Sequence, residues 1–119
     1  MPLSNVDWKR TKTTVVLYLS TTCHFCNESS AFYQKLVNAK AGGNFRIVAV
    51  LPQNTDEATR YLESRDIKPD QVLNASLNSI GVTSTPTLMM VSDGGVIFAS
   101  WRGKLDEKKE AEVFAKLSS

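Results

Sequence analysis

Two cysteines separated by two residues are the part of this sequence best suited to chemistry. Cys23 and Cys26 are the only cysteines in the chain, and His24 and Phe25 lie between them. A secreted domain stapled by disulfides usually has more cysteines at wider spacing. The pair is therefore interpreted as a local dithiol that opens and closes by thiol–disulfide exchange.

The residues before Cys23 predict where the dithiol sits. Residues 13–20 are a β-branched, mostly apolar run typical of a strand buried on both faces, and a helical period follows directly. A cysteine at the start of a helix lies near free N–H groups and the positive end of the helix dipole, which stabilise a thiolate. Cys26 lies one turn deeper in the same helix. We therefore predict that Cys23 attacks a substrate disulfide and that Cys26 resolves the mixed disulfide.

Three other uses are known for this cysteine spacing, and two of them need further residues. A closed zinc site needs four ligands, and His24 is the only other soft ligand in the chain. Covalent haem attachment needs a histidine directly after the second cysteine, where this chain has Asn27. A purely structural local disulfide is the third alternative. We expect redox chemistry with no metal and no cofactor.

The composition predicts one globular domain. Hydrophobic residues make up 42% and charged residues 22% of the 119 positions, which is ordinary for such a domain. The net charge of +2 is too small to indicate nucleic acid or a membrane surface as partner. No apolar run approaches the roughly 18 residues of a membrane span, and residues 1–8 contain no apolar signal region. We expect residues 1–119 to form a single, monomeric domain.

The rest of the pattern predicts alternating strands and helices. After the motif we expect a helix that buries Phe32, Tyr33, Leu36 and Val37 and ends at Gly42-Gly43, then a strand over 45–51. A helix capped by Asn54, with Glu57 at its third position, a short edge strand at 71–73 and a short helix from Ser76 to Gly81 follow. The last expected elements are a hairpin of 87–91 and 96–101 that turns at Asp93-Gly94-Gly95, and a helix capped by Asp106. Strand–helix–strand repeats imply parallel strands, and the hairpin adds an antiparallel edge. The predicted fold class is an α/β sandwich.

The dithiol and a later proline together resemble a known family. Cys23-x-x-Cys26 after a buried strand, followed by the run from Val82 through Thr85-Pro86 to Thr87 and by a Gly94-Gly95 hairpin, resembles the thioredoxin superfamily. The additional helix and short strand at residues 55–75 are similar to the bacterial thiol–disulfide interchange proteins related to TlpA and ResA. The resemblance spans about residues 13–117. It implies a thioredoxin-like three-layer α/β/α sandwich, with a mixed central sheet ending in a C-terminal antiparallel hairpin. The family's first β-α unit is truncated or absent here, because only residues 1–12 precede the motif strand.

The resemblance also implies roles for individual residues. Pro86 would follow a cis peptide bond and face the dithiol, with a strand start in trans as the alternative. The backbone N–H and C=O of Thr85 would pair with an extended substrate segment. Gly103 matches a glycine that lets a partner approach the groove, or is simply a turn residue. His24 and Phe25 would tune the redox properties, since a protonated imidazole near a thiolate favours the reduced form, and Phe25 would form a hydrophobic lip of the groove.

Two positions depart from the family pattern. Many members have tryptophan immediately before the first cysteine, where this chain has Thr22. Thioredoxins keep a buried aspartate beneath the motif as a proton acceptor for the second cysteine, and here that position is Leu17. The proton of Cys26 must then leave through water or another base.

The predicted function is that of a thiol–disulfide oxidoreductase, a protein disulfide reductase or interchange enzyme. Its partners would be protein or small-molecule disulfides and dithiols and a redox partner protein, with no nucleic acid and no metal. The resemblance favours the bacterial periplasm or cell envelope, with a signal or anchor outside this chain; the N-terminus read literally favours the cytoplasm. Two alternatives are a peroxiredoxin-type thiol peroxidase, whose expected proline and threonine are replaced here by Val16 and Ser20, and a redox-inert binding domain of the same fold.

Overall fold

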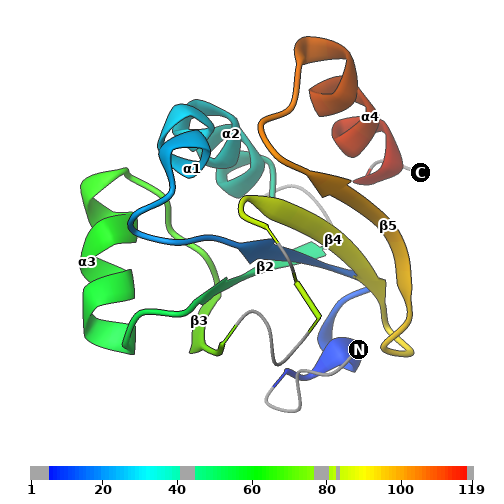
Figure 1. The fold of residues 1–119 in the computed structure, drawn as a ribbon. Coiled ribbons are helices and arrows are strands. Elements are labelled where there is room, and N and C mark those ends of the chain that lie inside the picture. Colours follow the sequence, from blue (N-terminus) through cyan, green and yellow to red (C-terminus); the bar gives the residue numbers. More distant parts are fainter. Residues whose placement is uncertain (1–5, 41–44, 77–80, 83, 118–119) are drawn as a thin grey trace.

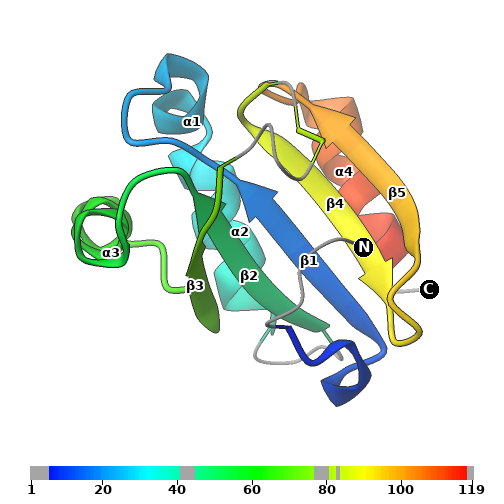
Figure 2. The same cartoon turned by 60° about the horizontal axis from the view of Figure 1, so that its bottom comes forward.

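The computed structural model describes residues 6–40, 45–76, 81–82 and 84–117, which form helices around one mixed sheet (Figure 1). The described elements are the 3-10 helix η1 (Trp8–Arg10), β1 (Thr13–Tyr18), α1 (His24–Glu28), α2 (Ser30–Ala39), β2 (Phe45–Leu51), α3 (Thr55–Ser64), β3 (Gln71–Asn74), β4 (Thr87–Ser92), β5 (Ile97–Arg102) and α4 (Glu107–Leu117). The sheet has the strand order β3-β2-β1-β4-β5, and Figure 2 shows it with α2 and α4 behind it. β1, β2 and β3 run parallel to one another, and β4 is antiparallel to both of its neighbours, β1 and β5. The predicted α/β class with a C-terminal antiparallel hairpin is confirmed.

The central strand β1 carries the dithiol at its carboxyl end. Its register pairs Val15 with Ile47 of β2 and with Met90 of β4. Every residue from Thr14 to Leu19 is buried, as expected of a strand covered on both faces. The chain that leaves this strand therefore starts from a rigid, doubly paired element.

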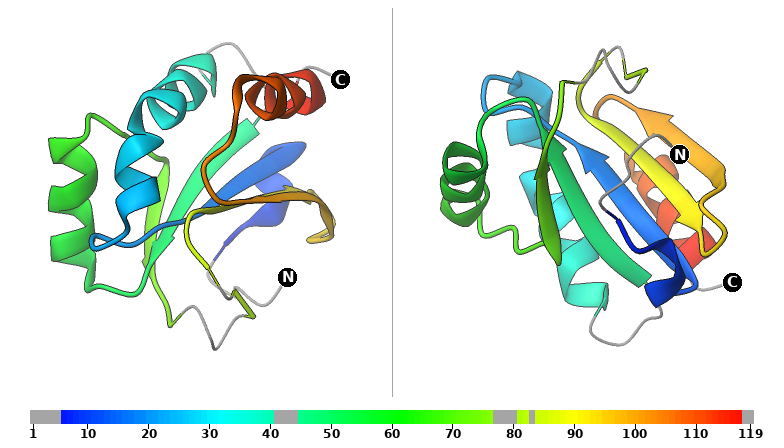
Figure 3. Two further views of the ribbon diagram at one scale, coloured as in Figure 1. Left: turned by 45° about the horizontal axis from the view of Figure 1, so that its top comes forward. Right: turned by 90° about the horizontal axis from the view of Figure 1, so that it is seen from below.

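The two faces of the sheet are covered differently. Helices α1, α2 and α4 lie on one face (Figure 3), where their side chains pack with α3 in a single core cluster with members such as Leu17, Cys26, Leu36, Leu62 and Val113. On the opposite face, a second cluster is closed by Val6 from the N-terminal segment and Val82 from the connection before β4, together with the partly buried Trp8 and Ala75. Among the described residues, irregular segments and η1 rather than a long helix form this thinner layer.

The local signals that begin and end elements are confirmed where the structure describes them. Asn54 Oδ1 accepts from the Glu57 N–H at 2.8 Å, and Asp106 Oδ1 accepts from the Lys109 N–H at 2.8 Å, so both predicted N-caps are formed. The predicted edge strand at 71–73 is β3. The expected Gly42-Gly43 helix end and the short helix between Ser76 and Gly81 fall on residues 41–44 and 77–80, outside the described residues. No helix in the described part of the chain is both long and apolar enough to span a membrane.

Candidate active site around Cys23 and Cys26

The dithiol lies at the turn from β1 into the short helix α1. Cys23 is the N-cap residue of α1, with extended backbone, and its Sγ accepts a hydrogen bond from the Cys26 N–H at 3.1 Å. The Cys23 N–H in turn donates to the Ser20 carbonyl at 3.1 Å. An N-cap side chain that accepts a backbone N–H is well placed to carry negative charge, because the free N–H groups of the first turn point toward it. The Cys23 sulfur is therefore the side-chain cap of the first turn of α1.

The second cysteine is in a different environment. Cys26 is only 1% exposed and belongs to the core cluster, whereas Cys23 is half-buried. Burial, reinforced by the hydrogen bond and charge of Cys23, raises the pKa of Cys26 to about 12, although hydrogen bonds from the Ser20 backbone and the Thr85 side chain act in the opposite direction. The predicted exposure of Cys23 and shielding of Cys26 are confirmed.

We call three members of the buried core cluster, Leu17, Cys26 and Tyr33, the underside of the dithiol. Leu17 is fully buried. Burial raises the pKa of the Tyr33 phenol well above its ordinary value. At neutral pH neither Leu17 nor Tyr33 accepts a proton, so the underside provides no base for Cys26.

The helix that carries the dithiol is short because the chain breaks at Ser29. The Ser29 backbone has φ −92° and ψ 2°, and α2 begins anew at Ser30. The Ser29 hydroxyl donates to the Phe25 carbonyl at 2.8 Å, and the Ser30 hydroxyl donates to the Asn27 carbonyl at 2.9 Å. The Phe25 carbonyl also accepts the Ser29 N–H at 3.1 Å, so Ser29 contacts the end of α1 through both its backbone and its side chain. The dithiol thus lies on a separate five-residue helix, held at its end by two hydroxyls.

The residues between the cysteines point outward. Phe25 is 53% exposed, which is unusual for a large apolar side chain, and 79% of the His24 side chain is exposed. His24 Nε2 lies 2.9 Å from Glu28 Oε2, and Lys104 Nζ lies 3.3 Å from Glu28 Oε1. We call His24, Glu28 and Lys104 the rim cluster.

The segment before β4 and the segment after β5 meet beside the dithiol. The Thr85–Pro86 peptide bond is cis, and the Thr85 side chain reaches Cys26. The Gly103 N–H donates to the Pro86 carbonyl at 2.7 Å. Gly103 has a φ of +76° and faces open space where a side chain would project. All predicted site residues are therefore brought together on one side of the molecule.

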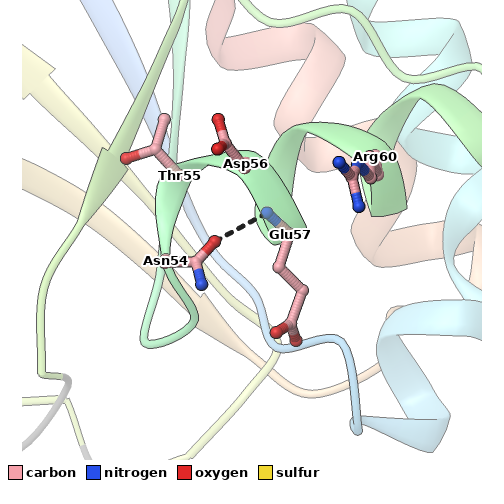
Figure 4. Close-up of a pocket in the computed structure, with 5 residues that line it drawn as sticks. All are labelled: Asn54, Thr55, Asp56, Glu57 and Arg60. Carbon is pink, nitrogen blue, oxygen red and sulfur yellow. Dashed lines mark hydrogen bonds between the residues drawn. The ribbon is translucent and has the colours of Figure 1, made fainter.

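The opposite side of the dithiol loop is held by the start of α3. Gln53 accepts from the Thr21 N–H at 3.2 Å and donates to the Ser20 hydroxyl at 3.1 Å. Glu57 Oε2 accepts from the Thr21 hydroxyl at 3.1 Å. Next to these contacts, an open hollow of about 520 Å³ is lined by Asn54, Thr55, Asp56, Glu57 and Arg60 (Figure 4). Neither cysteine is among these lining residues, and the hollow shares only Glu57 with the contacts that hold the dithiol loop.

A further contact joins α3 to the dithiol helix. The Tyr61 hydroxyl donates to Asn27 Oδ1, directly after Cys26 in the chain. Tyr61, Gln53, Glu28 and Lys104 are site residues that the sequence interpretation missed. The four-residue spacing of His24 and Glu28 could have revealed their pairing on a helix, but nothing in the local sequence indicates the partners of the other three.

Known structures resemble this chain over most of its length. A thiol-disulfide isomerase from Corynebacterium glutamicum matches at a TM-score of 0.76 and 15% identity, covering 100% of this chain and 88% of the other. A thiol:disulfide interchange protein from Bacteroides sp. matches at a TM-score of 0.74 and 22% identity, covering 95% and 77%. The chain has a thioredoxin fold.

One further structural neighbour of this thioredoxin fold is a secreted Mycobacterium tuberculosis disulfide oxidoreductase homologous to E. coli DsbE. It matches at a TM-score of 0.70 and 12% identity and covers 92% of this chain and 83% of its own. No family model and no curated protein matches the sequence. The expected resemblance to interchange proteins is confirmed at the level of the fold.

Within this thioredoxin fold, candidate metal ligands are sparse around the dithiol. In the described ranges, no three side chains of His, Cys, Asp or Glu gather closely enough to hold a metal ion.

Proposed function

We propose that this chain is a thiol–disulfide oxidoreductase that works through Cys23 and Cys26. One observation carries the proposal: the half-exposed Cys23 sulfur caps α1 and accepts the Cys26 N–H, while the Cys26 sulfur is buried directly behind it. The first sulfur is stabilised as a nucleophile and reachable by a substrate, and the second is protected until the first has reacted.

The reaction follows from this asymmetry. The Cys23 thiolate attacks one sulfur of a substrate disulfide, the substrate S–S bond breaks, and the leaving thiolate takes up a proton. Cys26 then loses its proton and attacks the Cys23 sulfur of the mixed disulfide. The second substrate thiol leaves, so the substrate gains two electrons and two protons while Cys23 and Cys26 close a disulfide. The reverse sequence oxidises a substrate dithiol.

We place the substrate groove between α1 and the two segments that contain Thr85 and Gly103. The backbone of Thr85 offers an N–H and a C=O to an extended peptide, in the manner of a short added strand. Gly103, hydrogen-bonded to Pro86 and open on its Cα side, leaves room for that peptide. Phe25, more than half exposed, provides an apolar lip. Protein disulfides are therefore the preferred substrate class.

A second protein must restore the starting redox state after each turnover, so the proposal includes a redox partner protein. The likeness to a secreted disulfide oxidoreductase supports a location in the bacterial cell envelope. An extracytoplasmic compartment has no thioredoxin or glutathione pool comparable to that of the cytosol, which makes a dedicated partner necessary there.

The proposal is tested with single cysteine variants and a protein disulfide such as that of insulin. The reduced protein is expected to release two thiols per substrate disulfide, Cys26→Ser to stop at a covalent mixed disulfide, and Cys23→Ser to be inert. A mixed disulfide formed by Cys23→Ser would overturn the assignment of roles. Consumption of hydrogen peroxide in preference to protein disulfides would replace the proposed function by that of a thiol peroxidase.

A further inference from the structure

Glu28 makes two ionic contacts at the edge of the dithiol helix. One carboxylate oxygen lies 2.9 Å from His24 Nε2 and the other 3.3 Å from Lys104 Nζ. His24 is the first residue of α1 and Glu28 its last, so the pair spans one helical turn. A single carboxylate thus engages a side chain from inside the cysteine motif and another from the segment after Gly103.

The position of the imidazole is the decisive feature. Cys23 caps the N-terminal end of α1, whereas the contact with Glu28 draws the ring of His24 toward the C-terminal end. An edge contact with Phe25, with ring centroids 5.6 Å apart, holds the ring on the same side. The imidazole therefore lies along the helix toward Glu28, in the direction away from the Cys23 cap.

Lys104 contacts the same carboxylate from the segment that follows Gly103. Its neighbour Gly103 is hydrogen-bonded to the Pro86 carbonyl, which fixes the start of the connection to α4 beside the dithiol. The Glu28 carboxylate pairs with the Lys104 ammonium at 3.3 Å and so balances its positive charge. The ionisable group in contact with His24 is Glu28, and Lys104 on this connection contacts the other oxygen of the same carboxylate.

We propose that Glu28 is a positioning residue that makes the dithiol more reducing, because it holds the His24 imidazole away from the Cys23 thiolate and neutralises Lys104. The inference rests on the proposed thiol–disulfide function and goes beyond it by naming a residue that sets the redox equilibrium. A cation near a thiolate favours the dithiol, so a carboxylate that withdraws two cations favours the disulfide.

The test is the equilibrium of the protein with glutathione. In this exchange, the protein dithiol and one glutathione disulfide give the protein disulfide and two glutathione thiols. Glu28→Gln is expected to lower this constant about two- to five-fold, the range of exposed charge pairs. Glu63→Gln removes the same charge from α3 and is expected to leave the constant unchanged.

A double-mutant cycle isolates the positioning role. In a His24→Ala background, Glu28→Gln is expected to lose at least half of its effect on a logarithmic scale. Retention of more than half, or no effect of Glu28→Gln in the original chain, would overturn the proposal. Lys104→Gln is expected to raise the constant, and a decrease would contradict the neutralising role. If the unaltered protein does not exchange with glutathione at all, the proposed function fails instead.

Discussion

The underside of the dithiol and its rim cluster differ in what controls the two sulfurs. Leu17, Cys26 and Tyr33 are buried together, so the state of Cys26 is governed by the cost of placing charge in an apolar interior. His24, Glu28 and Lys104 are in contact with water, where each ionic contact contributes little. Burial therefore imposes a large free-energy cost on ionisation of Cys26, whereas charges of the exposed rim cluster can change the state of Cys23 only slightly.

The largest effect is expected from a carboxyl group placed in the underside. Leu17→Asp puts an ionisable group where the chain has a fully buried leucine, and we expect it to reduce the free energy of unfolding by roughly 3 to 5 kcal/mol. Leu17→Asn is the matched control, with similar polarity but no proton to accept. Chemical denaturation measures the stability of both variants.

The same pair of variants tests how Cys26 loses its proton. If Leu17→Asp folds, it is expected to resolve a Cys23 mixed disulfide faster near neutral pH than Leu17→Asn, because a carboxylate can then act as base. Stopped-flow measurement of thiol release reports this rate. Equal rates in the two variants would mean that deprotonation of Cys26 does not limit resolution.

A second large contrast is expected between the two thiols of the reduced protein. Iodoacetamide should modify Cys23 first, because it is the exposed sulfur and its thiolate accepts the Cys26 N–H. Since the pKa of Cys26 is raised to about 12, its labelling rate should increase about tenfold per pH unit between pH 7 and 10. Mass spectrometric mapping of the labelled peptides measures both rates. Faster labelling of Cys26 than of Cys23 at pH 7 would contradict the expected order of reactivity.

A smaller effect is expected on the groove side. Gly103→Ala forces a side chain onto a backbone with φ of +76°, which we expect to cost about 1 kcal/mol of stability. The added Cβ meets open space, so reduction of a small disulfide should be unchanged. Gly94→Ala is the control without positive φ.

Bulkier Gly103→Val should slow the reduction of a protein disulfide specifically, and equal slowing of both substrates would argue against a groove at this position.

The smallest effect is expected where α3 touches the dithiol helix. Tyr61→Phe removes the hydroxyl that donates to Asn27 and should lower the free energy of unfolding by about 1 kcal/mol or less. The Arg65 guanidinium over the ring, 5.4 Å from its centroid, is retained in this variant. In an Asn27→Ala background the same substitution should have no effect. A remaining loss of stability there would show that the hydroxyl acts through another group.

Several features of the site follow from short-range patterns and could be predicted. The buried run of β1, the N-caps at Asn54 and Asp106, and the asymmetry between Cys23 and Cys26 depend on neighbours within one or two turns of the chain. The break at Ser29 could not be predicted in the same way, since the helical period continues through it. Two serine hydroxyls bond to the Phe25 and Asn27 carbonyls at this break, a use of serine that a count of apolar positions does not detect.

Local sequence patterns specify the alternation of strands and helices, the dithiol at the start of a helix and a leucine at position 17. The distant residues that surround the dithiol depend on how the chain folds. Gly103 meets Pro86 because β4 and β5 form an antiparallel pair, and Lys104 reaches Glu28 because the connection that follows β5 passes alongside α1. Periodicity and capping act over a few residues, whereas such contacts depend on strand order and on how helices pack across a sheet.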